Sequence, residues 1–290
     1  MKRILVTGAT GLLGSSLVPA LREQGHEVVR LGHAQRGDID ADLTDILDTH
    51  RALDSTVPDV IINLAALTDV DRCEREPAAA YRLNARIVDY LAGWIRSRTR
   101  SCHLIQISTD QVYGGSGPHR EERVELINYY AFSKYAGELL AQSVDATVLR
   151  TNLFGHSRIA NRQSLSDWLV SAMKERRPIH VFDDVLFSPL SLESLSHMIG
   201  LVVEQEIRGV FNLGSREGMS KADFAFCLAR HLEMPTAQLS RGLMTAATLA
   251  ARRPRDMRMD SSRFEAAFST TLPTLESELA RMKDSYVTEK

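Results

Sequence analysis

Tyr130 and Lys134 stand four residues apart in the segment NYYAFSKYAGE, so both side chains project from one face of a helix. A free tyrosine has a pKa of about 10, and a neighbouring ammonium group favours the phenolate. The pair could therefore exchange protons with a substrate near neutral pH. The spacing alone also fits an aromatic residue and a lysine that simply share a helix surface.

A row of polar side chains follows the apolar run HLIQI, in the stretch ISTDQVYGG. Thr109 and Asp110 could form a turn, because such side chains bond their own backbone readily. They could equally form a catalytic group at the carboxyl end of a strand. The next residue is Gln111, whose amide cannot act as a general base.

A glycine-rich turn, TGATGLLG, comes directly after the first apolar run. Glycines here allow a tight turn and a close approach to a pyrophosphate, and the following helix N-terminus attracts negative charge. The spacing is GxxGxxG, which differs from the common GxGxxG fingerprint. The turn predicts dinucleotide binding by Gly8, Thr10, Gly11, Leu12, Leu13 and Gly14.

The end of the second strand indicates which dinucleotide binds. NAD sites usually place an acid there for the ribose 2′-hydroxyl, whereas the 2′-phosphate of NADP needs cations. The stretch VVRLGHAQRGD offers Arg30, His33 and Arg36 before any acid. This order favours NADPH as the cofactor and leaves NADH open.

The elements that must position these residues alternate along the first half of the chain. Apolar runs predict strands, and amphipathic segments between them, at 12–24, 44–54, 78–98 and 129–143, predict helices. This pattern indicates an α/β fold, a Rossmann-type doubly wound parallel sheet with a smaller, mostly helical C-terminal portion. We expect residues 1–150, with about 190–214, to form the NADP-binding domain, and residues 151–189 and 215–290 to form the substrate-binding portion.

Composition narrows the remaining possibilities. The chain has 290 residues, a formal net charge of -2 and three scattered cysteines, with no apolar run long enough to cross a bilayer. These features predict a cytoplasmic protein that binds neither nucleic acid nor membrane. Cys227 and His231 share a helix face but show no further ligand nearby in the sequence, so no metal site is predicted.

Taken together, TGATGLLG, NLAA at 63–66, ISTDQVYGG and the Tyr130–Lys134 pair resemble the extended short-chain dehydrogenase/reductase family. The phrase PDVIINLAALTDVDRCEREPAAAYRLNA, FSP at 187–189 and RRPRDMRMD at 252–260 are similar to its dTDP-4-dehydrorhamnose reductase group. The likeness runs from residue 1 to about 270. One departure is LRTNLFGH, where that group usually has a tryptophan that contacts sugar.

The resemblance implies a role for each matched residue. Tyr130 would donate a proton to a ketone oxygen, and Lys134 would bind the nicotinamide ribose and depress the pKa of the tyrosine. Thr109 would orient the ketone, with Asp110 as a helper. Further cofactor contacts are implied for Tyr130 itself and for Asp42, Leu43, Ala65, Ala66 and Asn84, and substrate contacts for Thr68, Asp71, Asn152 and Arg253. Asn84 could instead be a buried, hydrogen-bonded core residue.

The implied reaction is NADPH-dependent reduction of the C4 ketone of a 6-deoxy-4-keto sugar nucleotide, with dTDP-4-dehydro-L-rhamnose as the leading substrate. Gln111 disfavours the related dehydratases, which carry an acid at this position. Two alternatives stay open: a non-catalytic NADP-binding regulatory subunit, such as that of methionine adenosyltransferase, and a sugar-nucleotide epimerase. The oligomeric state is also open, a homodimer included.

Overall fold

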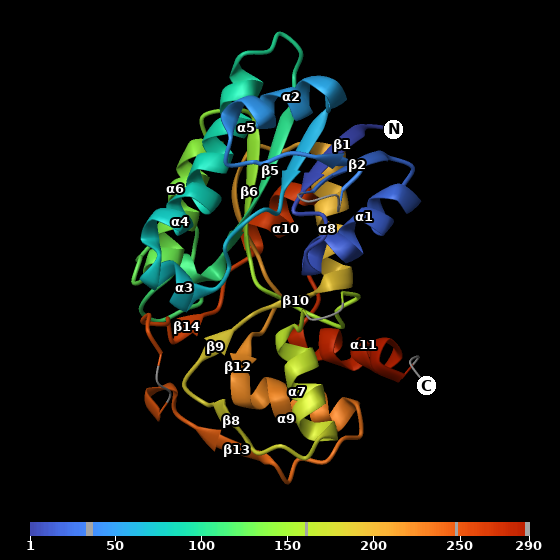
Figure 1. Cartoon of the computed structure of the whole chain (residues 1–290). Helices are drawn as coiled ribbons and strands as arrows, with labels where there is room; N and C mark the ends of the chain where they lie inside the picture. The colour runs from blue at the N-terminus through green and yellow to red at the C-terminus, as the bar shows by residue number, and fades with distance from the viewer. Residues whose placement is uncertain (33–36, 160–161, 247–248, 288–290) are drawn as a thin grey trace.

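A parallel β-sheet forms the larger part of the molecule (Figure 1). The computed structural model describes residues 1–32, 37–159, 162–246 and 249–287. Within these ranges the sheet has seven strands in the order β11-β6-β5-β4-β1-β2-β3, and every neighbouring pair is parallel. The strands are β1 (Arg3–Thr7), β2 (Glu27–Gly32), β3 (Ile39–Asp40), β4 (Val60–Asn63), β5 (His103–Thr109), β6 (Ala146–Thr151) and β11 (Gly209–Leu213).

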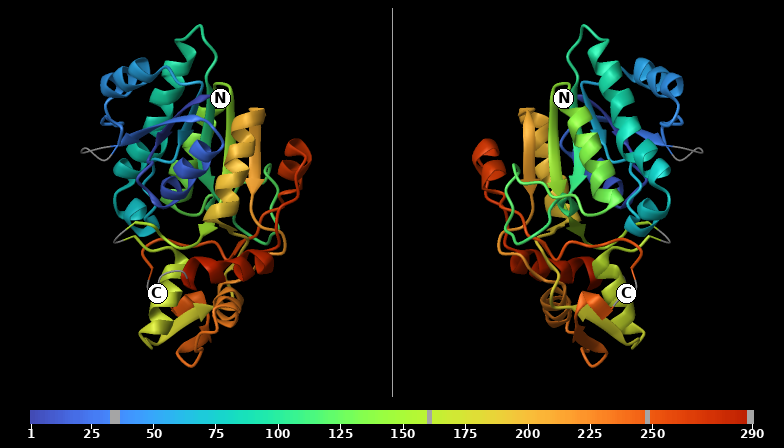
Figure 2. Two further views of the ribbon diagram at one scale, coloured as in Figure 1. Left: turned by 90° about the vertical axis from the view of Figure 1, so that its right-hand side faces the viewer. Right: turned by 90° about the vertical axis from the view of Figure 1, so that its left-hand side faces the viewer.

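Helices cover both faces of this sheet (Figure 2). The first face carries α1 (Leu12–Glu23) and α8 (Leu192–Gln205), and the opposite face carries α2 (Ile46–Thr56), α5 (Ile87–Arg96) and α6 (Tyr129–Ala141). The central strands β4 and β6 are buried along their whole length, as apolar runs without alternation predict. The doubly wound fold expected from the sequence is confirmed.

The strand order reverses beside β1. The chain moves outward from β1 to β2 and β3, and then crosses to β4, β5 and β6 on the other side. In open α/β sheets such a reversal leaves a crevice at the carboxyl ends of the two central strands. The residues that follow β1, β4 and β5 therefore meet at one place.

The helix predicted over 78–98 is three consecutive segments: α4 (Pro77–Tyr81), a π-helical turn (Arg82–Arg86) and α5. The turn packs closely on α6. A Cβ atom added to Gly137 of α6 would lie only 2.4 Å from the carbonyl oxygen of Asn84 in the turn. A short helix, α3 (Val70–Arg75), precedes α4. The loop after β4 is thus held against the helix that carries Tyr130 and Lys134.

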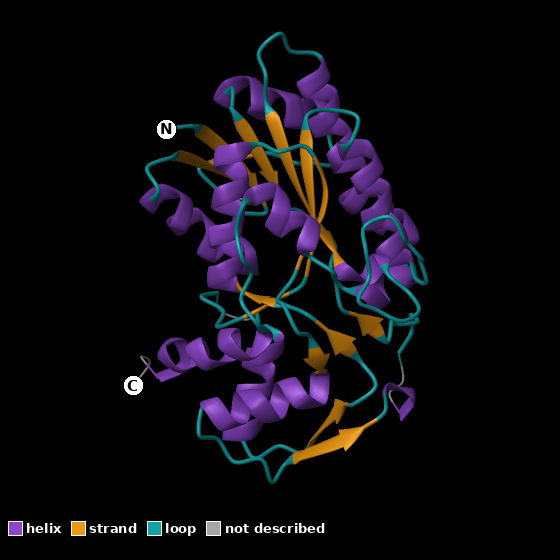
Figure 3. Ribbon diagram, turned by 180° about the vertical axis from the view of Figure 1, so that it is seen from behind, coloured by secondary structure: helices purple, strands orange, loops and turns teal. Residues whose placement is uncertain are grey.

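A smaller lobe lies below the carboxyl edge of the sheet in Figure 1. Its helices are α7 (Leu165–Lys174), α9 (Lys221–His231) and α11 (Leu275–Val287), around a separate apolar core that includes Phe154, Phe187 and Phe224. Figure 3 shows that it also contains short strands. These are β8 (Ile179–Phe182) with β13 (Leu239–Gly242), β9 (Leu186–Phe187) with β12 (Met219–Ser220) and β14 (Asp256–Met257), and β7 (Leu153–Phe154) with β10 (Leu190–Ser191) at its junction with the sheet.

One late segment returns to the sheet. Helix α10 (Ser262–Phe268) contacts β11 and α8, and its Phe264 and Phe268 lie in the same core as α1. In the described part of the chain, no helix is long and apolar enough to cross a membrane.

Candidate active site

A cleft of about 510 Å³ opens at the strand-order reversal, between the sheet and the smaller lobe. Its wall on the sheet side comes from the glycine turn after β1, the loop after β4, the end of β5 and the start of α6. The smaller lobe contributes Arg162, Ser164 and Leu165. The polar row after β5 and the Tyr130–Lys134 pair, which lie far from the glycine turn in sequence, share this one cavity.

The glycine turn has no room for side chains at two of its three glycines. Gly8 has a φ of 61°, and a Cβ atom there would lie 2.8 Å from the backbone nitrogen of Ala65. A Cβ atom on Gly14 would lie 2.4 Å from the carbonyl oxygen of Ala9. Helix α1 begins directly after Gly11, and no side chain caps its first turn. Backbone N–H groups with a positive helix end are therefore directed at the cleft, which suits a pyrophosphate.

Tyr130 lies in the first turn of α6 and is 7% exposed. Burial raises the pKa of its phenol well above the ordinary value, and the neighbouring hydroxyl of Thr109 offsets this only in part. Nζ of Lys134 donates to the carbonyl oxygen of Ile107, so the lowering of the Tyr130 pKa expected from Lys134 stays a prediction. Tyr130 is therefore a neutral phenol at pH 7 and holds a proton that it can donate.

Lys134 is buried one turn further along α6. Its Nζ donates a hydrogen bond to the carbonyl oxygen of Ile107 at 2.6 Å, and burial lowers its pKa to about 8. The carboxylate of Glu138, one turn beyond, acts in the opposite direction and favours the charged form. Lys134 is thus a cation at neutral pH with two donor positions left for a ligand.

Asp110 is 1% exposed and belongs to a small hydrogen-bonded group. The Nδ2 of Asn152 donates to its Oδ2 at 2.6 Å, and the hydroxyl of Thr109 donates to its Oδ1 at 3.2 Å. Burial raises the pKa of Asp110 to about 6, opposed by these contacts and by the charge of Lys221. The group fixes Thr109 and Asn152 at the floor of the cleft.

A second polar group lies behind β5, and of its members Ser108 also lines the cleft. The guanidinium of Arg150 donates to both carboxylate oxygens of Glu138, at distances of 2.7 to 3.1 Å, and to the hydroxyl of Tyr113 at 2.9 Å. The hydroxyl of Ser108 also donates to Glu138. These contacts join α6 to β5 and β6, so they fix the distance between Tyr130 and Thr109.

The cleft contains all four residues predicted to be catalytic and many of the predicted ligand contacts. Its lining includes Thr109, Asp110, Tyr130, Lys134, Gly8, Gly11, Leu12, Leu13, Gly14, Ala66, Thr68 and Asn152. The predicted contacts Thr10, Asp42, Leu43 and Ala65 lie outside its wall and stay predictions. The carboxylate of Asp42 accepts hydrogen bonds from the backbone and side chain of Thr44.

The structure does not present Arg30 as an uncompensated cation for a 2′-phosphate. Its guanidinium donates to Asp38, with the shortest distance 2.6 Å, and these bonds lower the pKa of that carboxyl group to about 2. Arg22 also contacts Asp38, at 3.3 Å. His33 lies outside the described residues. The charge pattern that favoured NADPH is therefore weaker than the sequence suggested.

Asn84 takes the core role that the sequence left open. It is 1% exposed, its Oδ1 accepts from the backbone of Leu67 at 2.7 Å, and its Nδ2 donates to the hydroxyl of Ser133 at 2.9 Å. It does not line the cleft. It fixes the loop that carries Ala66 and Thr68 against α6.

Two residues predicted to bind substrate bind each other. The Oδ1 of Asp71 accepts from Nη2 of Arg253 at 2.9 Å and from the backbone of Ala251 at 3.0 Å. The side chain of Asn128 donates to the carbonyl oxygen of Arg252 at 2.9 Å. Residues 251–253 are thereby attached to α3 and α6, and we call this region the Asp71–Arg253 contact.

Several residues of the cleft lining were not among the predicted catalytic residues or ligand contacts. They are Leu64, Ile107, Ser108, Gln111, Thr151, Leu153, Arg162, Ser164 and Leu165. Ile107, Ser108 and Gln111 flank Thr109 at the same strand end, so their position was a usable signal. No spacing in the sequence places Arg162 of the smaller lobe near Gly11, where a Cβ atom would lie 4.0 Å from its Nη1.

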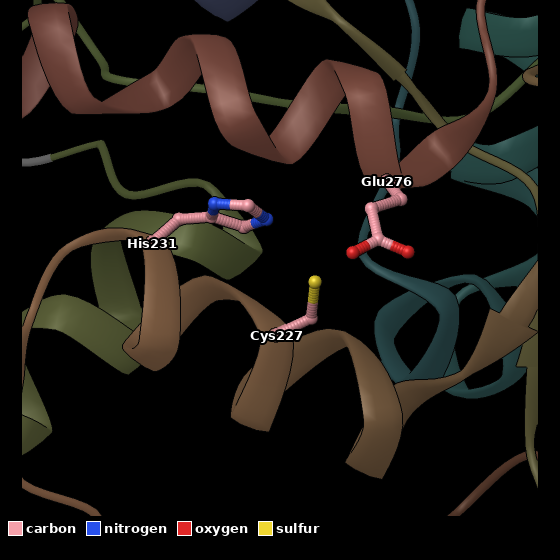
Figure 4. Close-up of side chains that lie close together, drawn as sticks. All are labelled: Cys227, His231 and Glu276. Atoms are coloured by element: carbon pink, nitrogen blue, oxygen red, sulfur yellow. The ribbon is translucent and has the colours of Figure 1, made fainter.

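A group of three side chains lies in the smaller lobe, far from the cleft residues in sequence (Figure 4). The expectation that Cys227 and His231 have no further ligand nearby is wrong, because Glu276 from α11 brings its carboxylate within 4.8 Å of both. Arg230, however, donates to the sulfur of Cys227 at 3.3 Å and to Glu276 at 2.6 Å. A guanidinium cation thus already binds two of the three metal-ligand candidates.

The sequence matches the family model described as RmlD substrate binding domain over residues 1–288. It is 30% identical to a probable low-salt glycan biosynthesis reductase of Haloferax volcanii, with 97% of each chain covered. It is also 30% identical to dTDP-4-dehydrorhamnose reductase of Aggregatibacter actinomycetemcomitans, covering 92% of this chain and 94% of the relative.

Two further similarities concern a subunit and a cofactor. The chain is 28% identical to methionine adenosyltransferase 2 subunit beta of Pongo abelii, covering 91% of this chain and 82% of the relative. Among solved structures, dTDP-4-dehydrorhamnose reductase of Bacillus anthracis in complex with NADP has a TM-score of 0.86 at 25% identity. That similarity covers 98% of this chain and 99% of the other.

Proposed function

The chain belongs to the RmlD substrate binding domain family, and on that premise we propose that it reduces the C4 ketone of a 6-deoxy-4-keto sugar nucleotide with NADPH. The leading substrate is dTDP-4-dehydro-L-rhamnose, which would give dTDP-L-rhamnose for polysaccharide synthesis in the cytoplasm. This proposal is supported by a relative and a solved structure that are named dTDP-4-dehydrorhamnose reductase. Both are similar to this chain over almost their whole length.

One observation carries the proposal: Thr109, Tyr130 and Lys134 line the same cleft as the glycine turn. A hydroxyl, a protonated phenol and an ammonium group are the set that carbonyl reduction requires, because the carbonyl oxygen becomes an alkoxide that needs a proton and positive charge nearby. The reaction therefore needs only a hydride donor in addition to these side chains.

The residues present fit a dinucleotide. Gly8 and Gly14 leave no room for a side chain, and the uncapped first turn of α1 suits a pyrophosphate. When bound, the nicotinamide supplies the hydride to the ketone carbon. NADPH is proposed from the relatives and NADH stays possible, since Asp38 compensates the charge of Arg30.

The proton comes from Tyr130 in this proposal. Its raised pKa keeps the phenol protonated before hydride transfer, which is the form that reduction needs. The O–H bond breaks as the substrate alkoxide forms, and the charge moves to the phenolate. We expect the ammonium charge of Lys134 to stabilise that phenolate until solvent returns a proton.

We propose that the two lobes divide the labour at the predicted boundaries. Residues 1–150, with about 190–214, would bind the cofactor, and residues 151–189 and 215–290 would contribute the sugar-nucleotide side. The lining supports this division, because the glycine turn comes from the first lobe while Arg162, Ser164 and Leu165 come from the second.

The test is a panel of dTDP-, GDP- and UDP-linked 4-keto sugars, assayed by the loss of NADPH absorbance and repeated with NADH. We expect turnover with the dTDP-linked 6-deoxy sugar. Tyr130→Phe should lower kcat by about 10²-fold or more and leave NADPH binding measurable. Full activity of this variant would contradict the assigned proton donor, and no turnover with any keto sugar would contradict the function.

The similarity to methionine adenosyltransferase 2 subunit beta favours a second candidate, a non-catalytic subunit that binds NADP and a partner enzyme. The intact set of Thr109, Tyr130 and Lys134 counts against it, because a subunit without chemistry has no need of all three. Purification from the native host separates the two functions. A stoichiometric partner enzyme, with no turnover of any keto sugar, would establish the second.

A further inference from the structure

Gln111 has an unusual environment within the cleft. It follows Asp110 at the end of β5, and its backbone N–H donates to the hydroxyl of Thr109 at 3.1 Å. Its side-chain Oε1 is buried and accepts no hydrogen bond. Among the cleft-lining residues that the structure describes, this is the one buried side-chain N or O atom without a partner.

A buried acceptor without a donor is costly. It loses its hydrogen bonds with water and gains none in return, at about 1–3 kcal/mol for a neutral group. Native proteins contain few such atoms, and those that persist call for a reason. An apolar side chain of the same length would avoid the cost, so the amide suggests an external donor.

The neighbouring polar groups donate to other acceptors. Asn152 and Thr109 donate to Asp110, and Lys134 donates to a backbone carbonyl. None of them donates to Oε1 of Gln111. The described residues therefore supply no donor to Oε1, and a ligand group that binds there must carry a hydrogen to donate. Phosphate oxygens and the ketone oxygen only accept, whereas the hydroxyls of either ligand and the carboxamide of the cofactor can donate. Gln111 follows Thr109 by two residues, and this position points to the hydroxyls of the keto sugar.

We propose that Gln111 accepts a hydrogen bond from a hydroxyl of the keto sugar beside the reacting carbonyl and so determines which sugars are reduced. The inference rests on the proposed function, because Thr109, two residues earlier, is taken to hold the ketone oxygen. The hydroxyl next to a C4 ketone in a 6-deoxy sugar is the one on C3. Sites that hydrogen-bond a substrate hydroxyl discriminate strongly against analogues that lack it.

The test compares Gln111→Met with the wild-type chain, using a dTDP-linked 4-keto-6-deoxy sugar and its 3-deoxy analogue. The wild type should prefer the hydroxylated sugar in kcat/KM by about 10–100-fold, the effect of leaving one buried neutral acceptor unpaired. Gln111→Met should lose that preference by slowing the hydroxylated sugar, with the Kd for NADPH unchanged. Gln142→Met, an exposed glutamine at the end of α6, is the matched control and should retain the preference.

The urea midpoint provides a second readout that does not need substrate. Gln111→Met should unfold at the same urea concentration as the wild type or at a higher one, because it removes the unpartnered acceptor. A clear loss of stability would show that the amide has an internal partner and would overturn the proposal. An unchanged sugar preference would also overturn it while the proposed function stands, whereas a wild type without turnover would contradict both.

Discussion

Two arginine–carboxylate pairs outside the cleft lining differ in how much water reaches them. Behind β5, the side chains of Arg150 and Glu138 are 3% and 0% exposed. At the Asp71–Arg253 contact, the side chains of Arg253 and Asp71 are 19% and 27% exposed. The buried pair has several further hydrogen bonds within the protein, whereas the Asp71–Arg253 pair borders solvent. The first should therefore govern stability and the second the approach of substrate.

The largest effect should follow from breaking the buried pair. Glu138→Ala leaves the charge of Arg150 buried without a partner, and we expect the free energy of unfolding to fall by about 3–5 kcal/mol. Urea denaturation measures this loss. The double variant with Arg150→Met should recover part of it, because no charge is then left buried. A loss under about 1 kcal/mol would show that water reaches Arg150, and the contrast between the two pairs would fail.

Neither of these pairs could be identified from the sequence, although the resemblance to the reductase family is confirmed. The glycine turn, the end of β5 and the Tyr130–Lys134 spacing are local patterns, so they predicted the sheet and one wall of the cleft. Asp71 and Arg253 come from segments joined only by the folding of the second lobe. Local patterns carry no information about such distant partners, so the ion pair could not be foreseen, and the substrate contacts of Asp71 and Arg253 stay predictions.

The pH dependence tests whether the buried pair also affects the chemistry. Burial lowers the pKa of Lys134 from 10.5 to about 8. As the pH rises through this value, Lys134 loses its charge, so kcat/KM should fall about tenfold per pH unit above 8. Lys134→Arg, which does not titrate here, should remove this basic limb from the profile.

Glu138→Gln should move the same limb to lower pH, because the carboxylate charge is what raises the pKa of Lys134 against burial. The pH profile of kcat/KM for this variant measures the shift, and Gln142→Met again serves as the control. A limb that stays in place would mean that Glu138 acts on α6 only through packing. The region behind β5 would then stabilise the fold without tuning the site.

The smallest change in stability should follow from breaking the Asp71–Arg253 contact. Asp71→Ala removes a partly exposed ion pair and one backbone hydrogen bond, so the free energy of unfolding should fall by about 1 kcal/mol or less. The hydrogen bond from Ala251 holds the pKa of Asp71 below its usual value, so this contribution is lost as the pH falls through that lowered pKa. The effect on substrate should be larger, because residues 251–253 lose an attachment beside the cleft.

We therefore expect KM for the keto sugar nucleotide to rise several-fold in Asp71→Ala, with kcat and the Kd for NADPH unchanged. Glu76→Ala, which removes the exposed Arg72–Glu76 pair next to the same helix, is the matched control and should leave KM unchanged. If Asp71→Ala instead lowered kcat with KM constant, Asp71 would support Tyr130 through α3 and α6. The Asp71–Arg253 contact would then help to position Tyr130, a role that is otherwise expected of the Arg150–Glu138 pair alone.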